Sequence, residues 1–121
     1  MDSSADKAVQ VSNAAGGSPF VLVCDHASNR IPERYGDMGL SPTERLSHIA
    51  WDPGALAVSM QLVERLDAPL VFSAVSRLVI DTNRLPTAEQ AIWTLSEATR
   101  IAANESLDPA ERAFRVATYH L

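Results

Sequence analysis

Residues 19–24 read PFVLVC, a short apolar run that is rich in β-branched and aromatic side chains. A run of this kind is typical of a strand that is buried on both faces of a sheet. It ends at Asp25 and His26. Because ligands of open α/β sheets bind in the crevice beyond the carboxyl ends of the strands, these two polar residues are the first candidates for a functional site.

Helix signals follow the strand after a long connection. Residues 27–40 contain two glycines and a proline, which favour a loop long enough to be functional. The next residues, SPTE at 41–44, form a capping box with proline at the first helical position and predict a helix to about Ala50. Asp52 is a second helix-cap candidate, and the amphipathic pattern after it predicts a helix over residues 53–66.

The second half of the chain returns to strand-like runs. Residues 70–75 and 78–80 are apolar and β-branched, so we expect strands there. Residues 87–102 have helical composition but a mixed pattern, and a helix is expected. Asp108, followed by proline, predicts a final helix that runs to Leu121. This order of elements indicates an α/β domain.

Length and composition limit the class of protein. The 121 residues suit one domain, expected over residues 19–121, and the Ser-, Ala- and Gly-rich residues 1–18 read as a flexible lead-in. A net charge of −5 without a basic stripe argues against a nucleic-acid partner. No stretch resembles a secretory signal or a membrane span. One cysteine makes no internal disulfide, so we expect a reducing compartment, the cytoplasm.

The residues at the end of the first strand allow several interpretations. On a strand, Cys24 and His26 would point to one side and Asp25 to the other, so His26 can reach a metal or substrate while Asp25 orients a neighbour. The alternative is that both polar side chains satisfy backbone groups in a turn. A Cys24 nucleophile is a further alternative to a buried structural thiol. His48 and His120 are weaker ligand candidates, on a solvated face and at the chain end.

Two other groups of polar residues are candidates. Asp52 can cap a helix, and a carboxylate fixed there can also coordinate a cation. Arg77, Asp81, Asn83 and Arg84 flank the apolar residues 78–80. A guanidinium fork beside an amide suits a substrate carboxylate, and the alternative is an Asp–Arg pairing that only holds the loop.

Three separated motifs, in this order, resemble the N-formylglutamate amidohydrolase family. They read CDHASNRIP at 24–32, IAWD at 49–52 with Gly-Ala soon after, and SRLVIDTNR at 76–84. The resemblance covers about residues 19–120. It implies a three-layer α/β/α sandwich of the phosphorylase/hydrolase or zinc-peptidase type, a bound zinc ion, and hydrolysis of the amide of a small N-acyl amino acid such as N-formylglutamate, a step in histidine degradation.

The resemblance also implies roles for individual residues. His26 would be a metal ligand, and Asp52 would be either a second ligand or a carboxylate that orients one. Asp25 and Asp81 are further candidates for carboxylates that orient the ligands. Arg77, Asn83 and Arg84 would bind the carboxylate of a small anionic N-acyl amino acid. The cofactor is expected to be Zn²⁺, although another divalent ion would suit a histidine and a carboxylate.

The chain also departs from the family pattern. Asn29 stands where related zinc enzymes place a glutamate, with Glu33 the next acid, and Pro53 follows the Trp-Asp pair. We expect the general base and a further histidine ligand beyond Leu121. The chain would then be the truncated N-terminal half of the enzyme, weakly active or inactive alone, and prone to form a homo-oligomer. The alternative is a non-catalytic domain that binds a small carboxylate or a protein partner.

Overall fold

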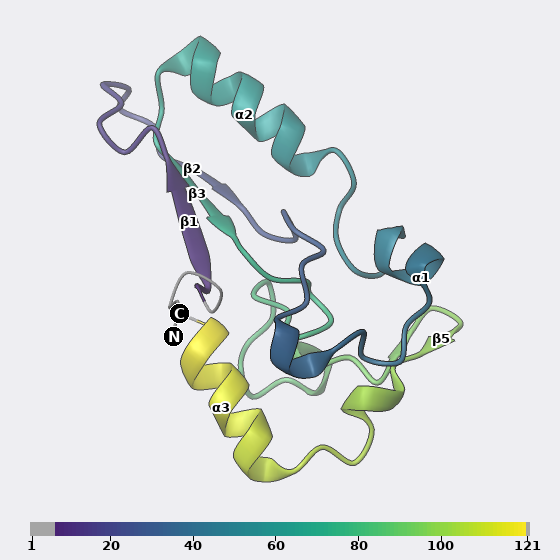
Figure 1. The fold of residues 1–121 in the computed structure, drawn as a ribbon. Helices are drawn as coiled ribbons and strands as arrows, with labels where there is room; N and C mark the ends of the chain where they lie inside the picture. Colours follow the sequence, from purple (N-terminus) through teal and green to yellow (C-terminus); the bar gives the residue numbers. More distant parts are fainter. Residues whose placement is uncertain (1–6, 121) are drawn as a thin grey trace.

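The fold is built around a β-α-β unit, and the computed structural model describes residues 7–120 of the chain. Strand β2 (Leu22–Cys24) is followed by a long segment that includes the short helix α1 (Pro42–Leu46), and then by helix α2 (Ala55–Leu66). Strand β3 (Leu70–Ser73) returns parallel to β2 (Figure 1). Strand β1 (Val9–Ser12) pairs antiparallel with β3, which gives the sheet order β1-β3-β2. The predicted α/β class is confirmed at this level.

Only one face of the three-stranded sheet is well covered. Leu22 lies opposite Leu70 in the parallel register, and Cys24 and Val63 of α2 join Leu70 in one buried apolar cluster. Val23 points to the other face because side chains alternate along a strand, and it is 75% exposed. The prediction that residues 19–24 are buried on both faces is therefore wrong.

The N-terminal segment is better ordered than its composition indicates. Residues 9–12 form β1 instead of part of a flexible lead-in, because the backbone of β3 offers them a free edge. The turn after β1 is fixed by Asp67, whose carboxylate accepts hydrogen bonds from Asn13 Nδ2 and Gly17 N, each at 3.0 Å. The remaining part of the predicted lead-in, residues 1–6, lies outside the described residues.

The packing of this turn predicts different effects on stability for substitutions of the adjacent Gly16 and Gly17. A Cβ on Gly16 would lie 2.5 Å from the backbone oxygen of Asp67, whereas a Cβ on Gly17 would meet only the Asp67 carboxylate, at 3.4 Å. We expect Gly16→Ala to lower the free energy of unfolding by about 1–3 kcal/mol, as overpacking does, and Gly17→Ala to change it much less. Urea denaturation of both variants measures this. Equal effects would mean that the turn is not packed against Asp67.

Two of the three helix starts predicted from a cap residue followed by proline are confirmed. Helix α1 (Pro42–Leu46) begins with the expected capping box, in which the Ser41 hydroxyl accepts from Glu44 N and the Glu44 carboxylate accepts from Ser41 N. Helix α1 ends earlier than expected, because the Ser47 hydroxyl and amide both donate to the Glu44 carbonyl. Helix α3 (Pro109–Tyr119) begins after Asp108, whose carboxylate accepts from Ala110 N.

The start of α2 differs from the prediction. Its N-cap is Gly54, with φ of 88°, and not Asp52. The Asp52 backbone carbonyl accepts from Ala55 N, but its side chain turns toward other residues. The helix therefore begins two residues later than expected because this carboxylate is used elsewhere.

The apolar residues 78–80 form turns inside the main core instead of a strand. The hydroxyl of Ser76 explains this difference, because it donates to the Ala50 carbonyl at 2.8 Å and accepts from Leu78 N at 3.1 Å. Leu78 and Val79 are fully buried. Burial, rather than strand pairing, accounts for their hydrophobicity.

Residues 87–102 are not the expected helix. A hairpin of β4 (Leu95–Ser96) and β5 (Thr99–Arg100) occupies this segment, with Glu97 at a φ of 53° in its turn. Three 3-10 turns complete the described structure: η2 (Glu33–Tyr35), η3 (Glu89–Ala91) and η4 (Ala102–Asn104). No helix within residues 7–120 is long and apolar enough to cross a membrane.

Candidate functional site

His26 occupies a turn just beyond the carboxyl end of β2. Its φ of 55° lies in the left-handed region, which is uncommon for a residue other than glycine. The expected strand alternation of Cys24, Asp25 and His26 therefore stops at Cys24. The His26 carbonyl accepts from Asp52 N at 2.9 Å, so the segment before α2 is tied to this turn. Such backbone conformations often occur at functional sites.

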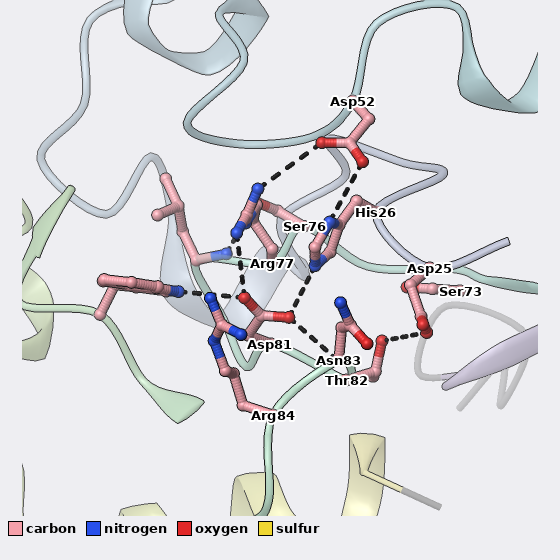
Figure 2. Close-up of polar contacts among 12 residues, drawn as sticks. Asp25, His26, Asp52, Ser73, Ser76, Arg77, Asp81, Thr82, Asn83 and Arg84 are labelled. Carbon is pink, nitrogen blue, oxygen red and sulfur yellow. Dashed lines mark hydrogen bonds and ion pairs between the residues drawn. The ribbon is translucent and has the colours of Figure 1, made fainter. Parts of the chain in front are cut away.

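Both ring nitrogens of His26 contact carboxylates (Figure 2). Nε2 lies 2.6 Å from Asp81 Oδ1, and Nδ1 lies 3.2 Å from Asp52 Oδ2. Asp81 is fully buried, whereas the side chain of Asp52 is about half exposed. The ring is thus held between one buried carboxylate and one that faces solvent.

Asp81 is the centre of the cluster. Besides His26, its carboxylate accepts hydrogen bonds from Trp93 Nε1 at 3.1 Å, Arg77 Nη2 at 3.1 Å and Asn83 N at 3.0 Å. Arg77 also lies 3.5 Å from Asp52, so it bridges the two carboxylates that hold the imidazole. Four donors on a buried carboxylate compensate for its loss of water.

Hydrogen bonds shift the pKa values of His26 and Asp81 in the directions that favour a protonated imidazole and an ionised carboxylate. The hydrogen bond to Asp81 raises the pKa of His26 above its ordinary value, although burial opposes it. Burial alone would raise the pKa of Asp81, but the hydrogen bonds from His26 and Trp93 outweigh burial and hold that pKa well below its usual range. An ionised Asp81 therefore keeps a proton on Nε2 of His26.

Asn83 and Arg84 lie beside Asp81 (Figure 2), and both residues are exposed. Within residues 7–120 the Arg84 guanidinium pairs with no carboxylate, and its contact is with the face of Trp93, 5.7 Å from the ring centroid. The cationic head is therefore available to an anion. Arg77, in contrast, already pairs with Asp52 and Asp81.

The other candidates lie apart from this arrangement. The Asp25 carboxylate accepts from the Thr82 hydroxyl at 2.8 Å and does not contact His26. Cys24 is buried, and its thiol donates to the Asp25 carbonyl. Because both nitrogens of His26 are engaged by carboxylates, the structure offers the thiol no histidine base. His48 pairs with Glu97 at the surface, and His120 donates to the Arg84 carbonyl.

His26 and Asp52, the two predicted metal ligands, lie side by side in the structure. His26 Nδ1 and Asp52 converge on the solvent side, while Asp81 holds the other ring nitrogen, as carboxylates do behind metal-bound histidines. However, within residues 7–120 no three His, Cys, Asp or Glu side chains are grouped so that they could hold a metal ion. Catalytic zinc takes three protein ligands. The described residues thus supply two candidate ligands.

One contributor to the cluster was missed from the sequence. Trp93 donates its indole N–H to Asp81 and lies under Arg84. It belongs to the segment for which a helix was expected. The sequence offered one general signal, because the N–H of a partly buried tryptophan needs a hydrogen-bond acceptor. This signal does not identify Asp81 as that acceptor.

Fold and site together define a small mixed α/β protein with a histidine–carboxylate–arginine cluster beyond the end of a parallel strand. The model of the N-formylglutamate amidohydrolase family matches residues 18–121. The chain belongs to this family, as the three motifs predict. A search of curated protein sequences gave no match.

A solved structure has the same fold. The crystal structure of gene product Atu2144 from Agrobacterium tumefaciens is 46% identical, with a TM-score of 0.94 over 99% of this chain. The match covers 48% of that protein, so the present chain spans about half of its length.

Proposed function

We propose that this chain provides part of the active site of a metal-dependent amidohydrolase that cleaves the amide of a small N-acyl amino acid, with N-formylglutamate as the first substrate to test. The observation that carries this proposal is the His26 ring, held between Asp52 and the buried Asp81 in a chain of the N-formylglutamate amidohydrolase family. A divalent ion, zinc in the first place, would be held by His26 Nδ1 and Asp52.

The residues of the chain divide the work in this proposal. Asp81 keeps the proton on Nε2 of His26, which leaves the Nδ1 lone pair for the metal. Zinc, when bound, polarises the acyl carbonyl and lowers the pKa of water. Asn83 and Arg84 bind the substrate carboxylate, and Arg77 adds positive charge beside them while it positions Asp52 and Asp81.

The remaining parts of the machinery belong to the half of the fold that this chain does not span. We place the third ligand and the general base there, together with the layers that complete an α/β/α sandwich. The exposed face of the sheet at Val11 and Val23 supports contact with another polypeptide, which includes a second copy in a homo-oligomer. The free, buried thiol of Cys24 suits a cytoplasmic location.

Zinc titration by calorimetry tests the metal site. We expect the chain to bind about one zinc ion, His26→Ala to abolish this binding, and His48→Ala to leave it unchanged because His48 pairs only with Glu97 at the surface. Circular dichroism of each variant checks that it is folded. Zinc binding that is absent, or that survives in His26→Ala, would contradict the assignment of the ligands.

A second candidate function is a non-catalytic domain that binds small carboxylates. The unpaired guanidinium of Arg84 and the presence of only two candidate ligands favour it. Under both functions, Arg84→Ala should weaken binding of N-formylglutamate by about 1.5–3 kcal/mol, the value of a hydrogen bond to a charged group. The control is Arg65→Ala, because Arg65 is an exposed arginine of helix α2. If the parent chain binds N-formylglutamate but no zinc, the second function is favoured.

A further inference from the structure

A pocket lies between the loop after β2 and helix α1. Its volume is about 410 Å³. The loop contributes Asn29, Arg30 and Ile31, and α1 contributes Pro42, Arg45 and Leu46. None of the lining residues belongs to the His26 cluster or to the proposed carboxylate contacts, so this pocket is distinct from the site described above.

Arg45 is the unusual residue in this pocket. Its Nε is buried and has no hydrogen-bond acceptor among residues 7–120. No carboxylate within residues 7–120 lies within ion-pair distance of its guanidinium, although four other arginines of the chain have such partners: Arg34, Arg77, Arg100 and Arg115. A buried donor without an acceptor is costly, and a negative charge in the pocket beside this guanidinium would offset part of that cost by charge attraction.

The surrounding structure holds the charge in place. The side chain of Asn29 donates to the Arg45 carbonyl at 2.7 Å, which ties the loop to the end of α1. The capping box at Ser41 fixes the start of the same helix. Arg30 also lines the pocket, but its guanidinium donates to the carbonyls of Ala74, at 3.0 Å, and Lys7, at 3.4 Å. Arg45 therefore supplies the positive charge that would attract an anion to this fixed frame.

The rest of the lining sets the character of the ligand. Ile31, Pro42 and Leu46 contribute apolar side chains to the same lining as Arg45. Pockets for small ligands commonly combine apolar walls with a few polar groups that fix orientation. We propose that this pocket binds a small organic anion, whose carboxylate or phosphate group contacts Arg45 and whose apolar body lies against Ile31, Pro42 and Leu46.

The test is a titration of the 121-residue chain with benzoate and with phenyl phosphate, followed by amide NMR shifts at constant ionic strength. We expect shifts centred on residues 29–31 and 42–46. Arg45→Gln should weaken binding at this pocket at least tenfold, while the matched surface variant Arg65→Gln should stay within about twofold. Arg45→Lys, which keeps the charge but loses the planar fork, should fall between them.

Several results would overturn the proposal. Shifts confined to Asn83 and Arg84 would show that the anion prefers the other site. Unchanged affinity in a folded Arg45→Gln variant would show that the guanidinium does not hold the ligand. Equal affinities for inorganic phosphate and phenyl phosphate would show that Ile31, Pro42 and Leu46 do not contact the ligand. The relative strength of benzoate and phenyl phosphate then identifies which anionic group is preferred, and the Arg84→Ala variant separates this pocket from the proposed catalytic function.

Discussion

Asp81→Ala is expected to destabilise the protein by about 3–5 kcal/mol, as the loss of one partner from a buried ion pair does. Asp81 is fully buried and accepts hydrogen bonds from His26, Arg77 and Trp93. Without the carboxylate, these donors lose their acceptor in a place that water does not easily reach. Urea denaturation at neutral pH measures the change, and an unaltered slope against denaturant would show that the native state stays compact.

Asp52→Ala is the matched control for this prediction. Asp52 contacts the same two cations, His26 and Arg77, but its side chain is 51% exposed. Exposed ion pairs contribute at most about 1 kcal/mol, so this variant should remain close to the parent chain in stability. If both substitutions cost the same, burial of the cluster is not what makes Asp81 important. The same Asp52→Ala variant should lose zinc binding under the proposed function.

The ion pair of His26 and Asp81 also leads to a prediction for the pH dependence of stability. The pKa of Asp81 is lowered, so its stabilising contribution is present above the ordinary value of 3.8 and is lost as pH falls through the lowered pKa. The pKa of His26 is raised, so its contribution is complete below 6.5 and is lost as pH rises through the raised pKa. Stability from this pair is therefore greatest between these limits. Asp81→Asn should flatten both slopes, and thermal denaturation across the pH range checks this.

Local signals explain which parts of the fold were predictable from the sequence. The caps at Ser41 and Asp108 depend on residues within one helical turn, and both helices start where expected. The same kind of signal at Asp52 was misleading, because His26 and Arg77 compete for its carboxylate. Their approach depends on tertiary structure, which a cap motif does not contain.

Longer-range structure was predictable only where motifs were specific. Strand β1 forms because β3, about sixty residues away in the chain, offers it an edge; for example, Val9 lies opposite Ser73. Composition does not report such pairing. The motifs around His26, Asp52 and Arg77 did predict which side chains gather at the site, but Trp93 lies outside them, and its contact with Asp81 follows from the path of residues 82–93.

Helix α3 is expected to support the candidate site from a distance through one buried arginine. Arg115 is 2% exposed, and its Nη1 donates to the Val79 carbonyl at 3.1 Å and to Asn104 Oδ1 at 2.8 Å. Its Nε pairs with Glu111 one turn earlier on the helix. Because Val79 lies two residues before Asp81, this guanidinium holds the turn that delivers the carboxylate to His26.

Arg115→Met should therefore destabilise the chain by about 3–5 kcal/mol. Methionine keeps most of the apolar stem but leaves the Val79 carbonyl and Asn104 without their donor. Arg112→Met is the control, since Arg112 donates to the Pro86 and Ala88 carbonyls from a half-exposed position on the same helix, and we expect a cost of about 1 kcal/mol. Hydrogen exchange should show faster opening at residues 79–83 in Arg115→Met than in Arg112→Met. If the two variants open these residues equally, α3 packs against the turn without positioning Asp81.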